Sequence, residues 1–115
     1  MNNYLDKIRA VVLIQIKILF KYENFITIIL SQIWGNDERS KLCKKYVFEY
    51  IQRIEEIVKQ GIQKKEIIDR DSDIIASGIF GFTCSSYIYK MRHDKVDVQK
   101  IFEEVDNSFL KKLKA

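Results

Sequence analysis

Apolar residues recur at steps of three and four along most of this chain, which is the spacing of one face of an α-helix. Short polar stretches that contain Asn, Asp or Gly divide the pattern into five segments. Asn24 can cap the second segment and Gly35 can end it. We therefore predict an all-α, five-helix bundle with helices at about residues 4–22, 24–34, 37–64, 71–92 and 96–113.

The first predicted helix is too apolar to lie on a surface. Only Gln15 and Lys17 interrupt the apolar run of residues 11–20. A helix of this kind is covered on more than one side. A membrane span would need about 20 apolar residues, and Lys17, Lys21 and Glu23 cut this run short. We predict a buried central helix and no membrane association.

The fourth predicted helix has one bulky face and one face of small residues. The bulky face includes Ile75, Ile79 and Phe82, and the small face consists of Ser77, Gly78, Gly81, Cys84 and Ser85. Each glycine inside a helix costs roughly 1 kcal/mol relative to alanine. A sequence tolerates this cost where another backbone comes close. The neighbour is either another helix of the same chain or a second subunit.

Composition supports one helical domain over residues 1–115. Hydrophobic residues make up 47% of the chain, and it contains no proline and four glycines, too few turn formers for an all-β fold. The net charge of +4 is dispersed among interleaved acids and bases. Dispersed charge is typical of solvated helix faces rather than of a surface that binds nucleic acid.

Candidate chemistry is sparse. His93 is the only histidine, and the two cysteines, Cys43 and Cys84, are far apart. This composition offers no familiar zinc or iron–sulfur ligand set and no nucleophile with a nearby base. We therefore predict no enzyme activity, no metal and no cofactor. Two unpaired thiols and a polar N-terminus without signal-peptide character indicate a cytoplasmic protein.

Large aromatic residues can either fill the core or line a pocket. Tyrosine and tryptophan offer a polar atom beside a large apolar area. Gln15, on the apolar first helix, needs a hydrogen-bond partner if it is buried. We predict a cavity for a small apolar or amphipathic ligand, and the alternative is a filled core. The cavity would be bounded by Gln15, Leu19, Trp34, Tyr46, Tyr50 and Phe82.

Residues 46–92, YVFEYIQRIEEIVKQGIQKKEIIDRDSDIIASGIFGFTCSSYIYKMR, resemble the regulatory domain of the tetracycline-repressor (TetR/AcrR) family. That family commonly has a long amphipathic helix ending in a pattern like GIxxGEI, then an acidic cap and a helix with a central glycine. The stretch GIQKKEI at residues 61–67 fits, except that Lys65 replaces the usual second glycine. If this position is left-handed, Lys65 carries modest strain.

The resemblance implies a ligand pocket among the first three helices. It also implies a homodimer in which the last two helices of each protomer form a four-helix bundle. The predicted interface residues are Ser77, Gly78, Gly81, Cys84, Ser85, Phe102, Val105 and Phe109. Family members begin with a helix-turn-helix module that this sequence does not contain. We therefore expect no specific DNA binding by this chain alone, whether it is a domain of a longer regulator or a natural relative without that module.

Two functions follow from these observations. The first is ligand sensing and dimerisation within a transcriptional regulator. The second is a stand-alone helical interaction module that sequesters a partner through mixed dimers. An internal cavity would favour sensing, and a solid core would favour interaction.

Overall fold

The computed structural model describes residues 3–115, apart from the side chains of residues 25 and 26. This part of the chain forms five α-helices and no β-strand, which confirms the predicted all-α fold. A short 3₁₀ helix, η1, follows the last α-helix. The elements are α1 (Tyr4–Lys21), α2 (Glu23–Gln32), α3 (Glu38–Gln63), α4 (Ser72–Met91), α5 (Val98–Ser108) and η1 (Leu110–Leu113).

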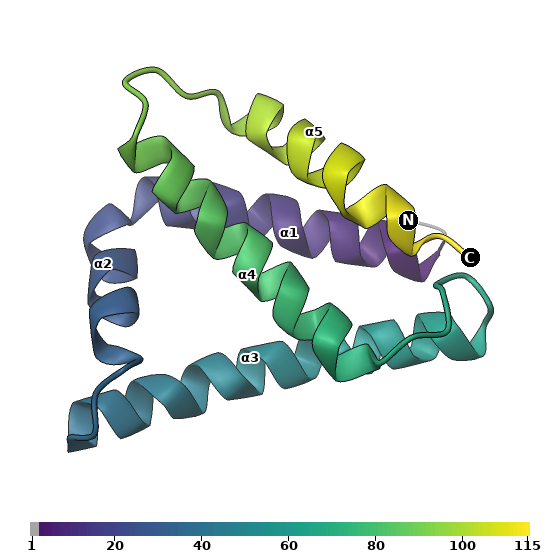
Figure 1. Ribbon diagram of the computed structural model, residues 1–115, viewed down its shortest axis with the longest axis horizontal. Helices are drawn as coiled ribbons and strands as arrows, with labels where there is room; N and C mark the ends of the chain where they lie inside the picture. The colour runs from purple at the N-terminus through teal and green to yellow at the C-terminus, as the bar shows by residue number, and fades with distance from the viewer. Residues whose placement is uncertain (1–2) are drawn as a thin grey trace.

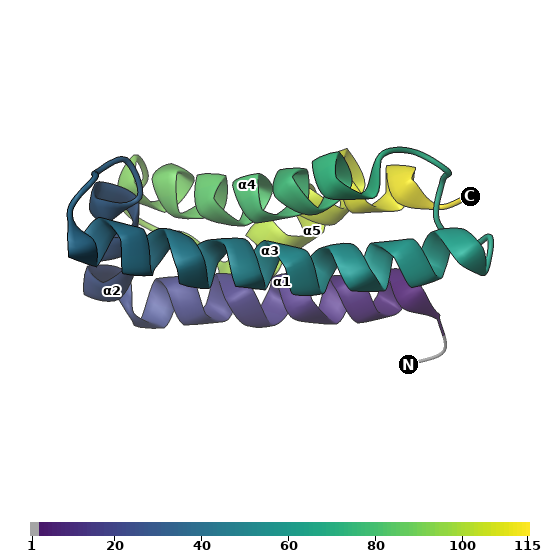
Figure 2. The ribbon, with the colours of Figure 1, turned by 90° about the horizontal axis from the view of Figure 1, so that it is seen from below.

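The helices form two layers. Seen edge-on, α4 lies above α3 and α1, and α5 slants behind α3 and ends at the level of α4 (Figure 2). The shortest dimension of the molecule is 20 Å, which corresponds to two helices packed at about 10 Å. In Figure 1, α4 runs diagonally between α3 and α5 and crosses α1, while the short α2 closes one end.

α1 is the central helix, as its apolar pattern predicted. Ile8, Val12 and Ile16 follow each other at four-residue steps and are each at most 1% exposed. They belong to one core with Ile54 and Val58 of α3, Ile75 and Ile79 of α4, and Ile101 of α5. Each such side chain contributes roughly 1.5–3 kcal/mol on burial, and the stripe of α1 is in contact with the other helices of this core.

Aspartates begin the last three α-helices. Asp37, Asp71 and Asp97 each accept a hydrogen bond from a backbone N–H in the first turn of α3, α4 and α5. α2 does not follow the prediction. It begins at Glu23 without a side-chain cap, so Asn24 lies inside the helix. Only Tyr22 separates α1 from α2, so it occupies the N-cap position, and its side chain makes no capping hydrogen bond.

Gly35 also has a different role from the predicted helix stop. α2 ends at Gln32, and no glycine in the described residues has a positive φ. A Cβ at Gly35 would instead lie 2.2 Å from Ser40 Oγ. The missing side chain lets the turn between α2 and α3 pass directly over Ser40, which is buried.

The C-terminal segment is tied to the loop between α3 and α4. α5 ends at Ser108 because Phe109 leaves the helical conformation, with φ at −137°. Leu110 and Leu113 of η1 then enter the core. The N–H of Ile68 donates to the carbonyl of Leu113 over 2.8 Å. An ion pair of 2.9 Å between Arg9 and Asp106 joins α5 to α1. These contacts, rather than contacts with α4, hold α5 in place.

Lys65 adopts the left-handed conformation that the sequence comparison suggested, with φ at 60°. It follows the last residues of α3, and the N–H groups of Lys65 and Glu66 donate to the carbonyls of Ile62 and Gly61. This is the hydrogen-bond pattern of a Schellman motif, in which glycine is the usual residue at the left-handed position.

We expect Lys65→Gly to raise the free energy of unfolding by about 0.5–1 kcal/mol. The left-handed backbone costs a residue with a Cβ roughly 1–2 kcal/mol, and the greater freedom of glycine in the unfolded chain offsets part of the relief. Urea denaturation followed by circular dichroism measures the change. Lys64→Gly is the matched control: Lys64 has φ at −82°, so glycine there should lower stability. An equal loss of stability in both variants would show that the left-handed backbone at Lys65 is not strained.

Candidate functional site

A cavity of about 210 Å³ lies among α1, α2, α3 and α4. Its lining combines aliphatic and aromatic side chains with a few uncharged polar groups. The lining residues are Gln15, Ile18 and Leu19 of α1, Ile29 and Leu30 of α2, Tyr46, Val47 and Tyr50 of α3, and Phe80, Thr83 and Cys84 of α4.

Helical spacing brings these side chains together. Tyr46 and Tyr50 are four residues apart on α3, and Phe80 and Cys84 are four residues apart on α4, so each pair projects from one helix face. Ile18 and Tyr46 are 38% and 62% exposed. Their exposure places the opening of the cavity on the side where α1 and α3 meet solvent.

Polar contacts hold α2 over the cavity. The hydroxyls of Thr27 and Tyr87 are 3.2 Å apart and join α2 to α4. Lys90 of α4 forms an ion pair with Glu23 at the start of α2. At the other end, Ser40 Oγ donates to Gln32 Oε1 over 3.1 Å. α2 is thus attached at both ends, and its middle covers the cavity.

Tyr50 presents an unusual polar group to this site. Its hydroxyl is buried and has no hydrogen-bond partner among the described residues. Its ring contacts Phe80 edge-on, with the ring centroids 5.9 Å apart. Burial, with a smaller effect of the nearby Cys84, raises the pKa of Tyr50. The phenol therefore stays neutral and keeps its proton to donate. Leaving such a group unpaired costs roughly 1–3 kcal/mol.

The neighbouring polar side chains do not supply the missing partner. Thr83 uses its own proton within α4, where its hydroxyl donates to the carbonyl of Ile79 over 2.9 Å. Burial raises the pKa of the Cys84 thiol to about 11. Cys84 is therefore a neutral thiol at physiological pH and a poor nucleophile.

Four of the six predicted pocket residues line this cavity: Gln15, Leu19, Tyr46 and Tyr50. Trp34 does not, because α2 ends before it and its side chain is 85% exposed. Phe82 does not either. It projects from another side of α4 and stacks on Phe109, with the ring centroids 4.7 Å apart.

Sequence reasoning missed Phe80, Thr83 and Cys84 as pocket residues. Cys84 was assigned to the small-residue face of α4, yet it lines the cavity. The helical spacing of α4 contained a signal for two of these residues. Phe80 and Thr83 lie four and seven residues after Ala76, and Ala76, Thr83 and Tyr87 are all buried. Together they mark a second inward face of α4, beside the one that carries Ile75 and Ile79.

The predicted interface residues divide into three groups. Val105 is mostly buried in the core and borders the groove between α4 and α5, whereas Cys84 lines the cavity. Phe102 and Phe109 are partly buried, and Phe109 covers Gly78. The outer stripe of α4 is exposed, and a Cβ added at Gly81 would meet no atom within 4 Å. This outer stripe consists of Ile74, Ser77, Gly81, Ser85 and Ile88.

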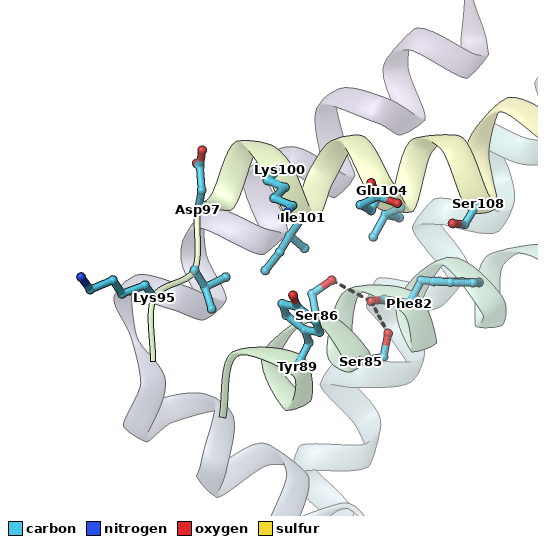
Figure 3. Close-up of a pocket in the computed structure, with 12 residues that line it drawn as sticks. Phe82, Ser85, Ser86, Tyr89, Lys95, Asp97, Lys100, Ile101, Glu104 and Ser108 are labelled. Atoms are coloured by element: carbon cyan, nitrogen blue, oxygen red, sulfur yellow. Dashed lines mark hydrogen bonds between the residues drawn. The ribbon is translucent and has the colours of Figure 1, made fainter. Parts of the chain in front are cut away.

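A groove of about 460 Å³ separates α4 from α5 beside this stripe (Figure 3). Phe82, Tyr89 and Ile101 contribute its apolar surface, and Lys100 and Glu104 lie along α5. The hydroxyls of Ser85 and Ser86 donate to the carbonyl of Phe82, over 2.8 and 3.0 Å. These two serines therefore satisfy their donors within α4, and the groove can accept apolar side chains.

Within the described residues, no group of three or more His, Cys, Asp or Glu side chains is placed to hold a metal ion. Among those residues, no helix has the length and apolar character that crossing a membrane would require.

No protein-family profile matches the chain, and no curated protein sequence does. A solved structure does match: a Clostridium perfringens protein described as a "putative fatty acid metabolism regulator" aligns with a TM-score of 0.89 and 27% sequence identity. The alignment covers 100% of this chain and 63% of that protein. This chain has a regulator fold. The protein that it aligns with is described as a regulator and not as an enzyme.

We expect Tyr50→Phe to raise the free energy of unfolding of the ligand-free protein by about 1 kcal/mol. The change keeps the ring and removes the unpaired hydroxyl, whose burial is costly. Thermal and urea unfolding measure the effect. Tyr46→Phe is the matched control, because the Tyr46 side chain is largely exposed. Removing its hydroxyl should change the free energy of unfolding by less than about 0.5 kcal/mol. A loss of stability in Tyr50→Phe would show that the hydroxyl has a partner.

Proposed function

We propose that this chain is the ligand-sensing and dimerisation domain of a TetR-like transcriptional regulator. The observation that carries the proposal is the cavity among α1–α4, with the unpartnered hydroxyl of Tyr50. A domain that only bound a partner through its surface would gain stability by filling this space. The cavity therefore favours sensing over the alternative of a stand-alone interaction module.

The ligand is a small, mainly apolar molecule. A cavity of 210 Å³ lies just below the range of about 300–1,000 Å³ typical of drug-sized ligands. The Clostridium perfringens protein is described as a regulator of fatty acid metabolism. An apolar or amphipathic metabolite suits both the lining of the cavity and that description.

The outer stripe of α4 and the adjoining groove form the dimer interface in this proposal. Ile74 and Ile88, at the two ends of the outer stripe, are 71% and 51% exposed. Together with the apolar side chains of the groove they would supply the apolar part of such an interface. Gly81 has no packing role within the protomer. Its cost in helix stability is explained if the backbone of a second subunit approaches there.

α4 connects the two sites. One side of this helix contributes Phe80, Thr83 and Cys84 to the cavity, and its outer stripe belongs to the proposed interface. A ligand that binds one position of α4 better than another would shift the population of dimer arrangements. Such a shift would change the separation of attached DNA-binding modules.

We expect Gly81→Leu to weaken the dimer at least tenfold while leaving the protomer folded. The leucine has room within the protomer but would separate the two backbones at a close interface, and leucine favours helix over glycine by nearly 1 kcal/mol. Sedimentation velocity measures the oligomeric state, and circular dichroism the fold. Gln52→Leu, at an exposed position on α3, is the control. An unmodified chain that stays monomeric at micromolar concentration would rule out the interface.

We expect benzene to bind in the cavity and raise the melting temperature. An apolar cavity of about 150 Å³ suffices for benzene, and a ligand at a hundred times its Kd stabilises by about 2.7 kcal/mol. Cys84→Leu, which fills part of the space, should reduce the shift. Because Trp34 lies on the surface, calorimetry is a better measurement than tryptophan fluorescence. An unchanged melting temperature at saturating benzene would exclude a usable cavity and with it the sensing function.

A further inference from the structure

The cavity contains no formal charge. None of its lining residues is Asp, Glu, Lys, Arg or His. The Tyr50 hydroxyl and the Cys84 thiol are both neutral at physiological pH because burial raises the pKa of each. An anion carried into this space would lose its hydration and find no cation. The cost of burying an unpaired ion is far larger than that of a neutral polar group.

The hydrogen-bond donors of the cavity differ in burial. The Gln15 amide and the Tyr46 hydroxyl belong to residues that are partly or largely exposed. Thr83 gives its proton to the carbonyl of Ile79, and a thiol such as Cys84 is a weak donor. The Tyr50 hydroxyl is the strong donor that is buried and unpaired among the described residues. Its natural complement is a neutral acceptor, such as a hydroxyl or carbonyl oxygen.

We propose that the cavity selects neutral molecules with a short apolar body and one hydrogen-bond acceptor, which receives the proton of the Tyr50 hydroxyl. This inference rests on the sensing function proposed above and specifies its ligand class. Alcohols, amides and undissociated acids belong to that class. Carboxylates and phosphorylated compounds do not, because the lining offers them no counter-charge.

The orientation of the ligand follows from the same contacts. A fatty acid could place its alkyl chain inside and its carboxylate in water at the opening near Ile18 and Tyr46. That arrangement leaves the Tyr50 hydroxyl unpaired beside the alkyl chain. Binding with the polar group inward satisfies the hydroxyl and requires that this group be neutral.

Calorimetric titration of the intact chain with hexanol, hexanamide and hexanoate tests the inference, because the three probes share an alkyl chain. At neutral pH we expect hexanol and hexanamide to bind at least tenfold more tightly than hexanoate. Only the undissociated acid would bind, so the apparent affinity for hexanoate should rise about tenfold for each unit by which pH falls towards its pKa.

Tyr50→Phe and Tyr22→Phe complete the experiment. Loss of one hydrogen bond should weaken hexanol binding to Tyr50→Phe about fivefold. Benzene binding to that variant should be unchanged. Tyr22→Phe, at an exposed tyrosine outside the cavity, should bind all probes as the unmodified chain does.

Two results would overturn the inference: hexanoate that binds as tightly as hexanol at neutral pH, or hexanol binding that Tyr50→Phe leaves unchanged. Either result together with normal benzene binding would leave the sensing function intact. Failure of benzene and all three probes to bind would overturn the sensing function as well.

Discussion

Every other helix of this protein is positioned by the need to cover α1. The stripe of Ile8, Val12 and Ile16 reaches almost complete burial only because α3, α4 and α5 each contribute aliphatic side chains against it. Because a single helix cannot be covered on all sides by one neighbour, the fold needs two layers. The site depends on the same constraint, since the cavity lies near the end of α1 where α2 replaces α5 as the cover.

α4 is the element in which core, cavity and surface meet. Its inward faces are occupied by Ile79 in the core and by Phe80 and Cys84 in the cavity, while Gly81 faces open space. A helix with such different neighbours has little amphipathic character, and its outward side is less polar than a solvated helix requires. The proposed dimer explains this composition, because a partner subunit would provide the missing cover.

Much of the fold was predictable, because the apolar stripe of α1 and the capping aspartates can each be recognised from a short stretch of sequence. The site was predictable only in part. Tyr50 and Gln15 were found because a large aromatic and a polar residue on apolar helices demand partners. Trp34 was misplaced because its position depends on where α2 ends. The helix ends at Gln32, two residues before Trp34, and the Trp34 side chain lies in solvent. Cys84 was misplaced because a small residue fits equally well beside another backbone or a cavity, and spacing alone cannot separate these cases.

The features that remain unexplained within the protomer have one property in common. An unpaired Tyr50 hydroxyl, an unfilled apolar cavity and an exposed helical glycine each cost the isolated chain stability, of the order of 1 kcal/mol or more. Substitutions that remove such costs are easy to find in natural proteins, and they commonly reduce function where a site needs the destabilising feature. Their coexistence on or beside one helix is expected if a ligand compensates the first two and a second subunit the third. Binding of the ligand in the cavity and of the second subunit at Gly81 would each stabilise the chain. Both sites include residues of α4, so ligand and partner act on the same helix.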